Sequence, residues 1–575
     1  MLILGLNNGI DAGAALVEDG RVLCAVNEER LNRKKMFWGP PLLSLEEVLR
    51  IADVDPADIG WVAQSSVTGG GGVNDDFLDP PGIKKLVELV SLLPFSHNDM
   101  VKRAYRVVSG GKRKDEVVDA RLRELGVVAP KRYIEHHHCH AASAYYCSPF
   151  GDAPEDVLVI TADGVGDGIC HSTGVVDKGH RIVRKHESMI YHSIAEIYAY
   201  VTHNLGFMYN RHEGKITGLA AYGKAEKTIE IFRRVMGWDP DRLELRSGLH
   251  AWGRLGARKL HAMLQGYKRE DIAAGLQRAL EEVMEGLVGA SMRRYEKRLL
   301  CVAGGLFCNV RMNQVLRELP EVEDIYVHPG MGDCGQGLGA ALGLWAELET
   351  APKPQLLRNV YLGPSYDDET IERALRSHGV AYHRSENVQR EAAQLLAQRR
   401  VVARFAGRME YGPRALGHRT IYYQTADRTV NDWLNKRLDR TEFMPFAPIV
   451  LKERAHEFFA DYDPARSVAA SFMTITYAAT PKGLELAPAA IHVDATARPQ
   501  TVTAADNPDP HALLKAYEEI TGLPILINTS FNMHEEPIVC SPNDAIRAFL
   551  QGRLDALAIG SFIALHPGGF DPGRG

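Results

Sequence analysis

Short apolar runs recur along the chain, and each ends in a turn of polar and glycine residues. Runs of this kind are typical of strands that are buried on both faces of a sheet. They start near residues 2, 156, 299, 325, 401 and 524. Residues 42–130 have a mainly helical pattern instead, broken by glycines at 69–72 and 110–111. The pattern predicts an α/β protein with a helical insertion that packs on the sheet.

The length of the chain indicates more than one domain. At 575 residues it exceeds the size of a single hydrophobic core, so two or three domains are expected. Residues 351–370 are rich in proline and charge, which predicts a linker. We therefore expect an N-terminal domain over residues 1–350, including the insertion at about 42–130, and a C-terminal domain over residues 371–575.

Composition excludes several classes of partner. The net charge of -6 gives no reason to expect nucleic acid or a membrane surface. The eight cysteines stand singly, without Cys-x-x-Cys pairs, as is typical of reduced thiols in a cytosol. No apolar run approaches the ~20 residues needed to span a bilayer. The first residues resemble a buried strand rather than a signal peptide. We therefore expect a soluble, cytoplasmic protein.

The most distinctive stretch places four histidines and a cysteine within five positions, from His136 to His140. Residues at i and i+4 lie on one face of a helix, so His136 and His140 could bind one metal ion together. The following residues 141–145 favour a helix. Two histidines do not complete a site, so carboxylates must come from elsewhere in the fold. The alternative is a polar helix start with unrelated histidines.

Two acidic residues follow buried strands at their carboxyl ends, where active groups collect. Asp163 ends one such strand, and Asp333 lies in a glycine-rich loop before a helix of small residues. With His136 and His140 they supply two imidazoles and two carboxylates, a set suited to Fe, Mn or Zn acting as a Lewis acid. Asp167, in the same turn as Asp163, is a further candidate that supports a ligand or faces phosphate. The alternative for acidic residues beside glycine is ordinary turn chemistry.

Glycine-rich strings in the first half also suit a nucleotide, because glycine lets the backbone approach phosphate closely. Lys215 lies in one such string and can act as a point charge for phosphate. Gly304 and Gly305 end a buried strand shortly before Asn309. The polar turn at residues 7–11 is of the type that holds phosphate in actin- and sugar-kinase-like ATPases. Each string alone is weak evidence, since small residues in tight turns usually serve only the backbone.

The second half carries many arginines among glycine, proline and apolar residues. Guanidinium groups bind oxyanions bidentately, so this composition predicts phosphate more readily than a solvated loop. Cations that converge in one domain also need an anion to offset their repulsion. A buried strand near 524 ends in amide and hydroxyl groups that can hold phosphate or a small carbonyl ligand. The candidate residues are Arg408, Arg414, Arg419, Lys436, Arg440, Arg498, Asn528, Ser530 and Asn532.

Several strings, in this order, resemble the NodU/CmcH family of O-carbamoyltransferases. In the first half they are His136-x-x-x-His-Ala-Ala-Ser, Thr161-Ala-Asp-Gly, Gly214-Lys-x-x-Gly-Leu-Ala-Ala-Tyr-Gly, Ala303-Gly-Gly-x-x-x-Asn and Gly332-Asp-x-Gly-x-x-Leu-Gly-Ala. In the second half they are Arg440-Thr-Glu-Phe-Met-Pro-Phe-Ala-Pro and His492-Val-Asp-x-Thr-Ala-Arg-Pro-Gln. The latter two resemble the antibiotic-tailoring branch more than the nodulation branch. The resemblance covers essentially the whole chain, with one departure at residues 306–308, where the family usually reads Val-Ala-Leu.

The resemblance implies an actin-like ATPase domain, similar to tRNA threonylcarbamoyl-transferase, followed by a YrdC-like domain. It implies an iron-type ion held by His136, His140, Asp163 and Asp333. The C-terminal domain would form carbamoyl-adenylate from carbamoyl phosphate and ATP with Mg²⁺. The N-terminal domain would then transfer the carbamoyl group to a hydroxyl of a small-molecule acceptor such as an antibiotic. A histidine near the metal, His137 or His138, is a candidate general base, or equally a support for the ligands. A homodimer fits the family.

Other classes of function remain open. An actin-like ATPase or sugar kinase needs only the first half, and it leaves the arginine-rich second half without a role. A HypF-type maturation factor shares both domains but normally carries Cys-x-x-Cys zinc pairs, which this chain lacks. A non-enzymatic metal- or nucleotide-binding protein accounts poorly for so many converging polar groups. The sequence does not identify the acceptor, since an aminoglycoside, a macrolide, a β-lactam precursor or a sugar would all fit.

Overall fold

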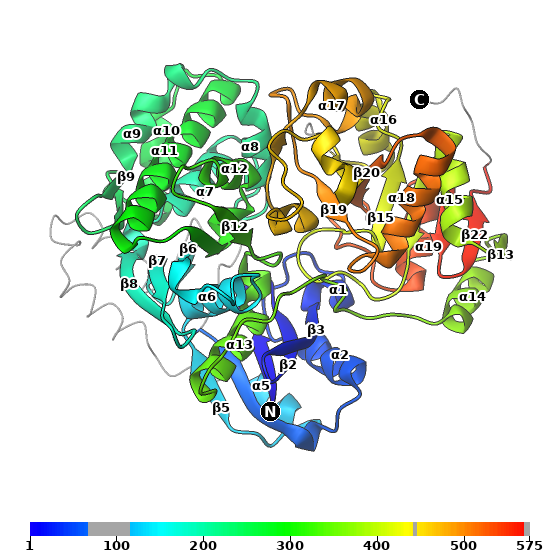
Figure 1. Cartoon of the computed structure of the whole chain (residues 1–575), viewed down its shortest axis with the longest axis horizontal. Coiled ribbons are helices and arrows are strands. Elements are labelled where there is room, and N and C mark those ends of the chain that lie inside the picture. The colour runs from blue at the N-terminus through cyan, green and yellow to red at the C-terminus, as the bar shows by residue number, and fades with distance from the viewer. Residues whose placement is uncertain (67–115, 441–444, 569–575) are drawn as a thin grey trace. The chain divides into compact units, whose positions relative to one another are not determined.

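The computed structural model describes residues 1–66, 116–440 and 445–568 (Figure 1). These residues form two compact units, and each is treated by itself below. Unit 1 comprises Met1–Val22, Trp38–Leu42 and Val54–Leu356. Unit 2 comprises Leu23–Phe37, Leu43–Asp53 and Leu357–Gly575. Two short N-terminal segments thus belong with the C-terminal part of the chain, which the predicted boundaries did not include.

The first sheet has the strand order β3-β2-β1-β4-β5. Its strands are β1 (Leu2–Asn7), β2 (Gly13–Glu18), β3 (Arg21–Asn27), β4 (Ile59–Ser65) and β5 (Lys131–Ile134). Strands β1, β2, β4 and β5 belong to unit 1, whereas residues 23–27 of β3 are counted with unit 2. Strand β1 pairs antiparallel with β2 and parallel with β4, and β4 pairs parallel with β5. The apolar run of β1 is almost entirely buried, as its composition predicts.

The second sheet repeats this arrangement with the order β12-β11-β6-β7-β8. Strands β6 (Val157–Gly166), β7 (Ile169–Val176) and β8 (Ile182–Met189) are antiparallel, and β11 (Leu299–Ala303) and β12 (Asp324–Val327) extend the sheet in parallel. Each sheet is therefore an antiparallel three-strand meander with two parallel strands added to its first strand. The predicted α/β class is confirmed. The duplicated strand order agrees with the expected actin-like fold.

Helices pack on both sheets of unit 1. Helix α13 (Gln336–Leu348) packs against α6 (His136–Tyr146) and against β1 (Figure 1). The other helices of unit 1 are α5 (Glu116–Glu124), α7 (Ile194–Asn204), α8 (Glu213–Ala220), α9 (Ile229–Val235), α10 (Gly253–Met263), α11 (Arg269–Tyr295) and α12 (Val310–Arg317), and a hairpin is formed by β9 (Met236–Asp239) and β10 (Glu244–Ser247). None of the described helices has the length and apolar character that crossing a membrane requires.

The expected helical insertion is only partly described. Residues 67–115 lie outside the described residues, so the glycine breaks predicted there are not tested. Within the described part, α2 (Leu42–Ala52) and α5 are helical as expected, but β4 is a strand of the first sheet. The prediction of a mainly helical segment was therefore wrong at β4, whose apolar residues pair with β1 in the core.

Unit 2 is built on an eight-stranded mixed sheet with the order β13-β22-β21-β14-β15-β20-β16-β19. In that order the strands are Tyr382–Arg384, Phe562–Leu565, Ala556–Ile559, Val402–Phe405, Arg419–Tyr423, Ile525–Ser530, Ala447–Leu451 and Gln500–Val502. Its helices are α1 (Glu28–Asn32), most of α2, α14 (Asp368–Ser377), α15 (Val388–Ala397), α16 (Val430–Arg437), α17 (Pro481–Leu486), α18 (Pro508–Thr521) and α19 (Pro542–Gln551), and a small second sheet pairs β17 (Tyr477–Ala478) with β18 (Thr496–Ala497).

Two hydrophobic cores cover the two faces of this sheet. Successive strand residues point to opposite faces, and β15 shows the division. Ile421 and Tyr423 belong to the core that includes residues of α14, α16 and α19, whereas Tyr422 belongs to the core with α15 and α18. The sheet is thus a central layer between helices. Strand β20, whose end carries several predicted site residues, is an interior strand between β15 and β16.

Candidate metal centre and phosphate site

Helix α6 positions two histidines on one face, as predicted. The helix begins at His136, after Glu135 caps it by accepting a hydrogen bond from the backbone of His138 at 2.8 Å. His136 is anchored at both backbone ends: its N–H donates to Asp167 Oδ2 at 2.8 Å, and its carbonyl accepts from Gln336 Nε2 at 3.2 Å. His140 follows one turn later, with its ring centroid 4.8 Å from that of His136.

Four predicted ligands meet at this face. His136 Nε2 lies 3.1 Å from Asp163 Oδ2 and 3.4 Å from Asp333 Oδ1. His140 Nε2 lies 3.3 Å and 3.5 Å from the same two oxygens. One ligand atom from each residue falls within 4.8 Å of the other three. Residues nearly 200 positions apart in the sequence therefore form a cluster of two imidazoles and two carboxylates, which suits Fe, Mn or Zn.

Glycines shape the surroundings of Asp163. Its Oδ1 accepts backbone hydrogen bonds from Gly164 at 2.7 Å and Gly305 at 3.2 Å, which leaves Oδ2 directed at the histidines. Gly304 has a φ of +112°, and a Cβ there would lie 2.2 Å from the carbonyl oxygen of Ala162. Gly304 and Gly305 were predicted to serve a nucleotide. Here they allow η5 (Gly305–Cys308) to approach the carboxylate of Asp163.

The cluster is strongly coupled electrostatically. Burial lowers the pKa of His136, but the charges of Asp333 and Asp163 outweigh it and raise that pKa to about 10. The pKa of His140 is also raised, because burial lowers it but the carboxylates of Asp163 and Asp333 outweigh burial. Although burial raises it, the pKa of Asp163 is held well below its usual range by the two histidines. Burial and Asp163 raise the pKa of Asp333. A bound cation would displace the histidine protons, so the donor set fits a divalent metal.

The structure corrects the expectation that His137 or His138 is a general base. Both ring nitrogens of His137 are engaged: Nδ1 with the hydroxyl of Thr161 at 2.7 Å and Nε2 with the carbonyl of Ile169 at 3.2 Å. Burial, followed by the charges of His136 and His140, lowers its pKa well below the usual value. The His138 ring lies against Gly343 of α13, away from the ligand face. Helical periodicity turns both positions away from His136 and His140.

Asp167 supports the cluster from behind. Its Oδ2 accepts from the backbone N–H of His136, and its Oδ1 accepts from the hydroxyl of Ser66 at 2.8 Å. The carboxylate therefore fixes the start of α6.

Two other predicted residues of unit 1 lie among helices. Lys215 is buried in α8. Asn309 caps α12 by accepting from the N–H of Met312 at 3.0 Å, and its amide exchanges hydrogen bonds with Gln277 of α11. Its side chain thus contributes to the packing of two helices.

An acidic group beside the cluster was missed by the sequence analysis. Glu196 of α7 is buried, and both of its oxygens accept from the hydroxyl of Tyr209, at 2.9 and 3.0 Å. A Cβ at Gly164 would lie 3.1 Å from Glu196 Oε1, so this carboxylate adjoins the residue after Asp163. Burial, with a further contribution from Glu196, raises the pKa of Glu213 to about 7. Glu213 lies two residues before Lys215, in a string that was selected for its lysine and glycines and not for this acidic residue.

In unit 2, two predicted arginines lie close to each other. Burial and the charge of Arg414 lower the pKa of Arg498 well below its usual range. Within the described residues, Arg498 forms no ion pair and donates no hydrogen bond. Two guanidinium groups that repel each other favour an anion between or beside them.

The loop that carries Arg414 is held by buried side chains. Asn528 donates to the carbonyl of Ala415 at 3.2 Å and to Gln500 Oε1 at 2.6 Å, and Gln500 donates to the carbonyl of Leu416 at 2.8 Å. Glu410 Oε1 accepts from the N–H of Leu416 at 2.8 Å. The buried Oδ1 of Asn528 has no hydrogen-bond partner in the described part of the chain. Asn528 therefore joins the loop to the central strand β20.

Arg440 forms hydrogen bonds with three residues at and just after the end of β20. Its guanidinium donates to Thr529 Oγ1 at 2.9 Å, to the carbonyl of Ser530 at 2.7 Å and to the carbonyl of Asn532 at 2.8 Å. The structure thus brings Arg440, Ser530 and Asn532 together as expected. Lys436 is exposed at the end of α16.

Arg408 and Arg419, two further phosphate candidates, donate to backbone carbonyls. Arg408 donates to the carbonyls of Gly363 at 3.2 Å and Leu362 at 2.6 Å. Arg419 is fully buried, donates to four carbonyls and stacks on Phe405, with its guanidinium carbon 3.7 Å from the ring centroid. Their guanidinium groups supply hydrogen-bond donors that these backbone carbonyls would otherwise lack.

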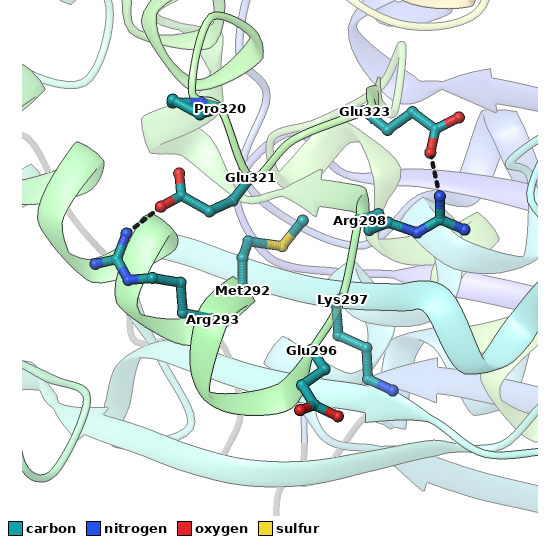
Figure 2. Close-up of a pocket in the computed structure, with 8 residues that line it drawn as sticks. All are labelled: Met292, Arg293, Glu296, Lys297, Arg298, Pro320, Glu321 and Glu323. Carbon is teal, nitrogen blue, oxygen red and sulfur yellow. Dashed lines mark hydrogen bonds and ion pairs between the residues drawn. The ribbon is translucent and has the colours of Figure 1, made fainter.

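A separate pocket near the end of α11 contains none of the predicted residues (Figure 2). Its lining consists of Met292, Arg293, Glu296, Lys297, Arg298, Pro320, Glu321 and Glu323. Arg293 pairs with Glu321, and Arg298 pairs with Glu323 at 2.8 Å. Because its arginines are neutralised by neighbours, the pocket shows no preference for an anion.

Comparison with known proteins decides the family. The family model for the carbamoyltransferase N-terminus matches residues 2–342, and the model for the carbamoyltransferase C-terminus matches residues 393–566. The chain belongs to the carbamoyltransferase family. It is therefore an enzyme of carbamoyl transfer, and the family expected from the sequence motifs is confirmed.

Relatives of this carbamoyltransferase match over nearly its whole length. The uncharacterized protein sll1178 of Synechocystis sp. is 31% identical, covering 96% of this chain and 94% of the relative. Nodulation protein NolNO of Sinorhizobium fredii is 31% identical over 98% of this chain and 82% of the relative. Nodulation protein U of Rhizobium tropici is 26% identical over 96% and 94%.

Solved structures are more distant. Full-length HypF in its phosphate- and nucleotide-bound form is 14% identical, with a TM-score of 0.34 over 61% of this chain and 47% of HypF. A ROK hexokinase from Thermus thermophilus is 14% identical, with a TM-score of 0.30 over 61% of this chain and all of the kinase.

Proposed function

We propose that this carbamoyltransferase works in two steps at two sites. Unit 2 would form carbamoyl-adenylate from carbamoyl phosphate and ATP, and unit 1 would transfer the carbamoyl group to a hydroxyl of a small-molecule acceptor. The observation that carries the proposal is the convergence of His136, His140, Asp163 and Asp333 at one point of unit 1. A kinase of similar fold would leave both this cluster and the arginines of unit 2 without a role.

In unit 2, a YrdC-like role is supported by the paired arginines Arg414 and Arg498. Water would hydrolyse carbamoyl phosphate to carbamate and inorganic phosphate. A carbamate oxygen would then attack the α-phosphorus of ATP, with pyrophosphate leaving. The two guanidinium groups would neutralise phosphate charge, and they have the bidentate geometry for it. Arg440 would hold Ser530 and Asn532 in place at the end of β20, where they can orient the small carbamoyl group.

In unit 1, His136, His140, Asp163 and Asp333 would hold a divalent ion, for which we propose iron, with manganese or zinc as alternatives. Such an ion supplies Lewis-acid polarisation of a carbonyl oxygen. Asp167 keeps His136 at the start of α6, and Gly305 and Gly164 keep Asp163 Oδ2 directed inwards. Attack by the acceptor hydroxyl on the carbamoyl carbon would release AMP and form an O-carbamoyl ester. We propose a hydroxylated natural product, such as an antibiotic, as the acceptor.

The decisive experiment measures pyrophosphate release from ATP with and without carbamoyl phosphate. We expect release that depends on carbamoyl phosphate in the wild-type protein. Asp333→Ala should keep this release but lose metal and carbamoyl transfer, because it removes a ligand of unit 1 only. Arg414→Ala should lose the release and keep the metal.

The outcomes separate the two-site scheme from its rivals. A folded, metal-loaded protein that releases no pyrophosphate under any of these conditions contradicts adenylate formation and favours the sugar-kinase alternative. If Asp333→Ala loses both half-reactions while remaining folded, the scheme of two separate sites is contradicted.

A further inference from the structure

The N-terminal helix α1 is part of unit 2, and it is attached to the loop that carries Arg414. Arg30 is 5% exposed, and its Nη2 donates to the carbonyl of Gly412 at 2.8 Å. Gly412 lies two residues before Arg414, whereas Glu410 holds the loop at Leu416, two residues after it. The loop is therefore fixed on both sides of the arginine that faces the proposed phosphate.

A second arginine of the same segment reaches the other predicted part of the site. Arg33 Nη1 donates to the carbonyl of Ile538 at 2.7 Å, and its Nη2 donates to that of Pro537 at 2.7 Å. Asn532 donates to the carbonyl of Glu536 at 3.0 Å, so Arg33 holds the residues next to the contact made by Asn532. Arg30 and Arg33 of this segment therefore donate to backbone carbonyls of two different loops.

Apolar packing and a buried carboxylate fix α1 itself. Leu31 packs on a buried cluster of Met409, Ala415, Ile538 and Cys540, which joins the two loops held by Arg30 and Arg33. Glu28 is buried, and it accepts from the N–H of Ser44 at 2.7 Å, which ties α1 to α2. Two charged contacts and one apolar contact therefore converge on the same pair of loops.

We propose that Arg30 and Arg33 are positioning residues for the adenylate-forming site of unit 2. They would act through backbone carbonyls, Arg30 on the loop of Arg414 and Arg33 on the loop that follows Asn532. The inference rests on the proposed function, since it takes Arg414 to bind phosphate. A loop that carries a binding group needs fixed geometry, because displacement of a reacting group by about 1 Å costs on the order of 100-fold in rate.

The test compares Arg30→Gln, Arg33→Gln and Arg414→Ala with a matched control. Arg50→Gln is the control, because Arg50 lies on α2 in the same unit, is 60% exposed and pairs only with Glu47 in the described contacts. Carbamoyl-phosphate-dependent pyrophosphate release is measured, with separate kcat and KM for carbamoyl phosphate. We expect kcat/KM to fall about 10- to 100-fold in Arg30→Gln and Arg33→Gln, mainly through KM, with Arg50→Gln unchanged. Metal content, a property of unit 1, should not change.

Arg30→Lys gives a second measurement if Arg30→Gln does not fold. Lysine keeps the charge and one donor for the Gly412 carbonyl but lacks the guanidinium geometry, so it should restore part of the lost kcat/KM. Kinetics of Arg30→Gln and Arg33→Gln equal to those of Arg50→Gln, with Arg414→Ala inactive, would overturn the inference and leave the proposed function standing. Full pyrophosphate release by Arg414→Ala would overturn both.

Discussion

Asp163 uses its two carboxylate oxygens for different tasks, and this division defines the candidate metal centre at the residue scale. Oδ1 accepts two backbone hydrogen bonds, and Oδ2 faces both histidines. A carboxylate fixed in this way cannot rotate to satisfy only one partner. Groups behind the ligands of a metal site commonly change affinity about 10- to 100-fold when removed. Asp167, which holds the start of α6, is such a group here.

We expect Asp167→Ala to weaken metal binding about 10- to 100-fold without affecting pyrophosphate release. The change removes the acceptor of the His136 N–H and of the Ser66 hydroxyl. Asp167→Asn should recover part of the affinity, because its amide oxygen can still accept from His136. Titration of metal-free protein with Mn²⁺ or Zn²⁺ measures the effect. Affinity equal to that of the wild type in Asp167→Ala would show that α6 needs no such anchor.

Glu213 predicts a pH dependence of stability. Its pKa is about 7 in the fold, above the usual 4.5, mainly because of burial and then because Glu196 is near. The folded chain therefore holds this proton more tightly than the unfolded chain. The resulting stabilisation is complete below pH 4.5 and is lost as the pH rises through 7. The groups that face Glu213 include Glu196, Tyr209 and Tyr198.

Glu213→Gln should remove this dependence, since a neutral amide has no proton to lose. We expect the variant to match the wild type near pH 5 and to exceed it above pH 8 by on the order of 1–3 kcal/mol. Thermal unfolding at the two pH values measures the difference, with the exposed Glu226→Gln as control. Equal pH dependence in wild type and Glu213→Gln would show that Glu213 is ionised at no cost in the fold.

At the scale of elements, the site depends on the close contact between α6 and α13. A Cβ at Gly339 of α13 would lie 2.1 Å from the carbonyl oxygen of Cys139 in α6. The atom concerned is backbone, so the two helices would have to separate. Cys139 stands between His136 and His140, and a shift of α6 therefore moves both rings of the candidate metal centre. Small residues in α13 thus support that cluster through packing.

Gly339→Ala should destabilise unit 1 by about 3 kcal/mol, because overpacking of a core contact costs roughly 1–3 kcal/mol and a backbone neighbour yields least. It should also weaken metal binding. Gly214→Ala in α8 is the matched control, since a Cβ there meets nothing within 4 Å. That substitution should be neutral or slightly stabilising. The midpoint of thermal unfolding and the metal content report the two effects. A stable, metal-binding Gly339→Ala would contradict the role of this contact.

Some of these elements could be predicted from sequence, and the reason differs from case to case. The i, i+4 spacing of His136 and His140 fixes their common face in any helix, so the metal pair was accessible from periodicity alone. Spacing does not tell which arginine in a loop meets a ligand. Arg408 and Arg419 donate to backbone carbonyls that come close to them only in the fold. Likewise, strand β4 could not be predicted from its own residues, because it pairs with β1, which lies far from it in the sequence.

At the scale of the whole molecule, the chain order does not coincide with the division into units. Residues 23–37 and 43–53 belong to unit 2 although they lie within the predicted N-terminal domain. The linker composition at 351–370 located one boundary near Leu357, where the C-terminal part of unit 2 begins. The linker composition did not indicate that α1 belongs to unit 2. Arg30 and Arg33 make their contacts with residues about 380 and 500 positions away in the sequence.

Division into two units also predicts how inactive variants behave together. Asp333→Ala retains the proposed adenylate-forming site of unit 2, and Arg414→Ala retains the metal centre of unit 1. Mixed in one solution, they could cooperate only if carbamoyl-adenylate made by one molecule reached another. A mixed anhydride exposed to water is subject to hydrolysis, and enclosure of reactive intermediates prevents such side reactions.

We therefore expect a mixture of the two variants to form little or no carbamoylated acceptor. Each variant alone should form none, whereas pyrophosphate release by Asp333→Ala should continue in the mixture. The measurement is product formation from carbamoyl phosphate, ATP and an acceptor at several protein concentrations. Product that rises with the concentration of Arg414→Ala would contradict confinement, because capture of a free intermediate becomes more frequent as capturing sites are added. Product formation independent of protein concentration would instead indicate assembly of the two variants into one oligomer.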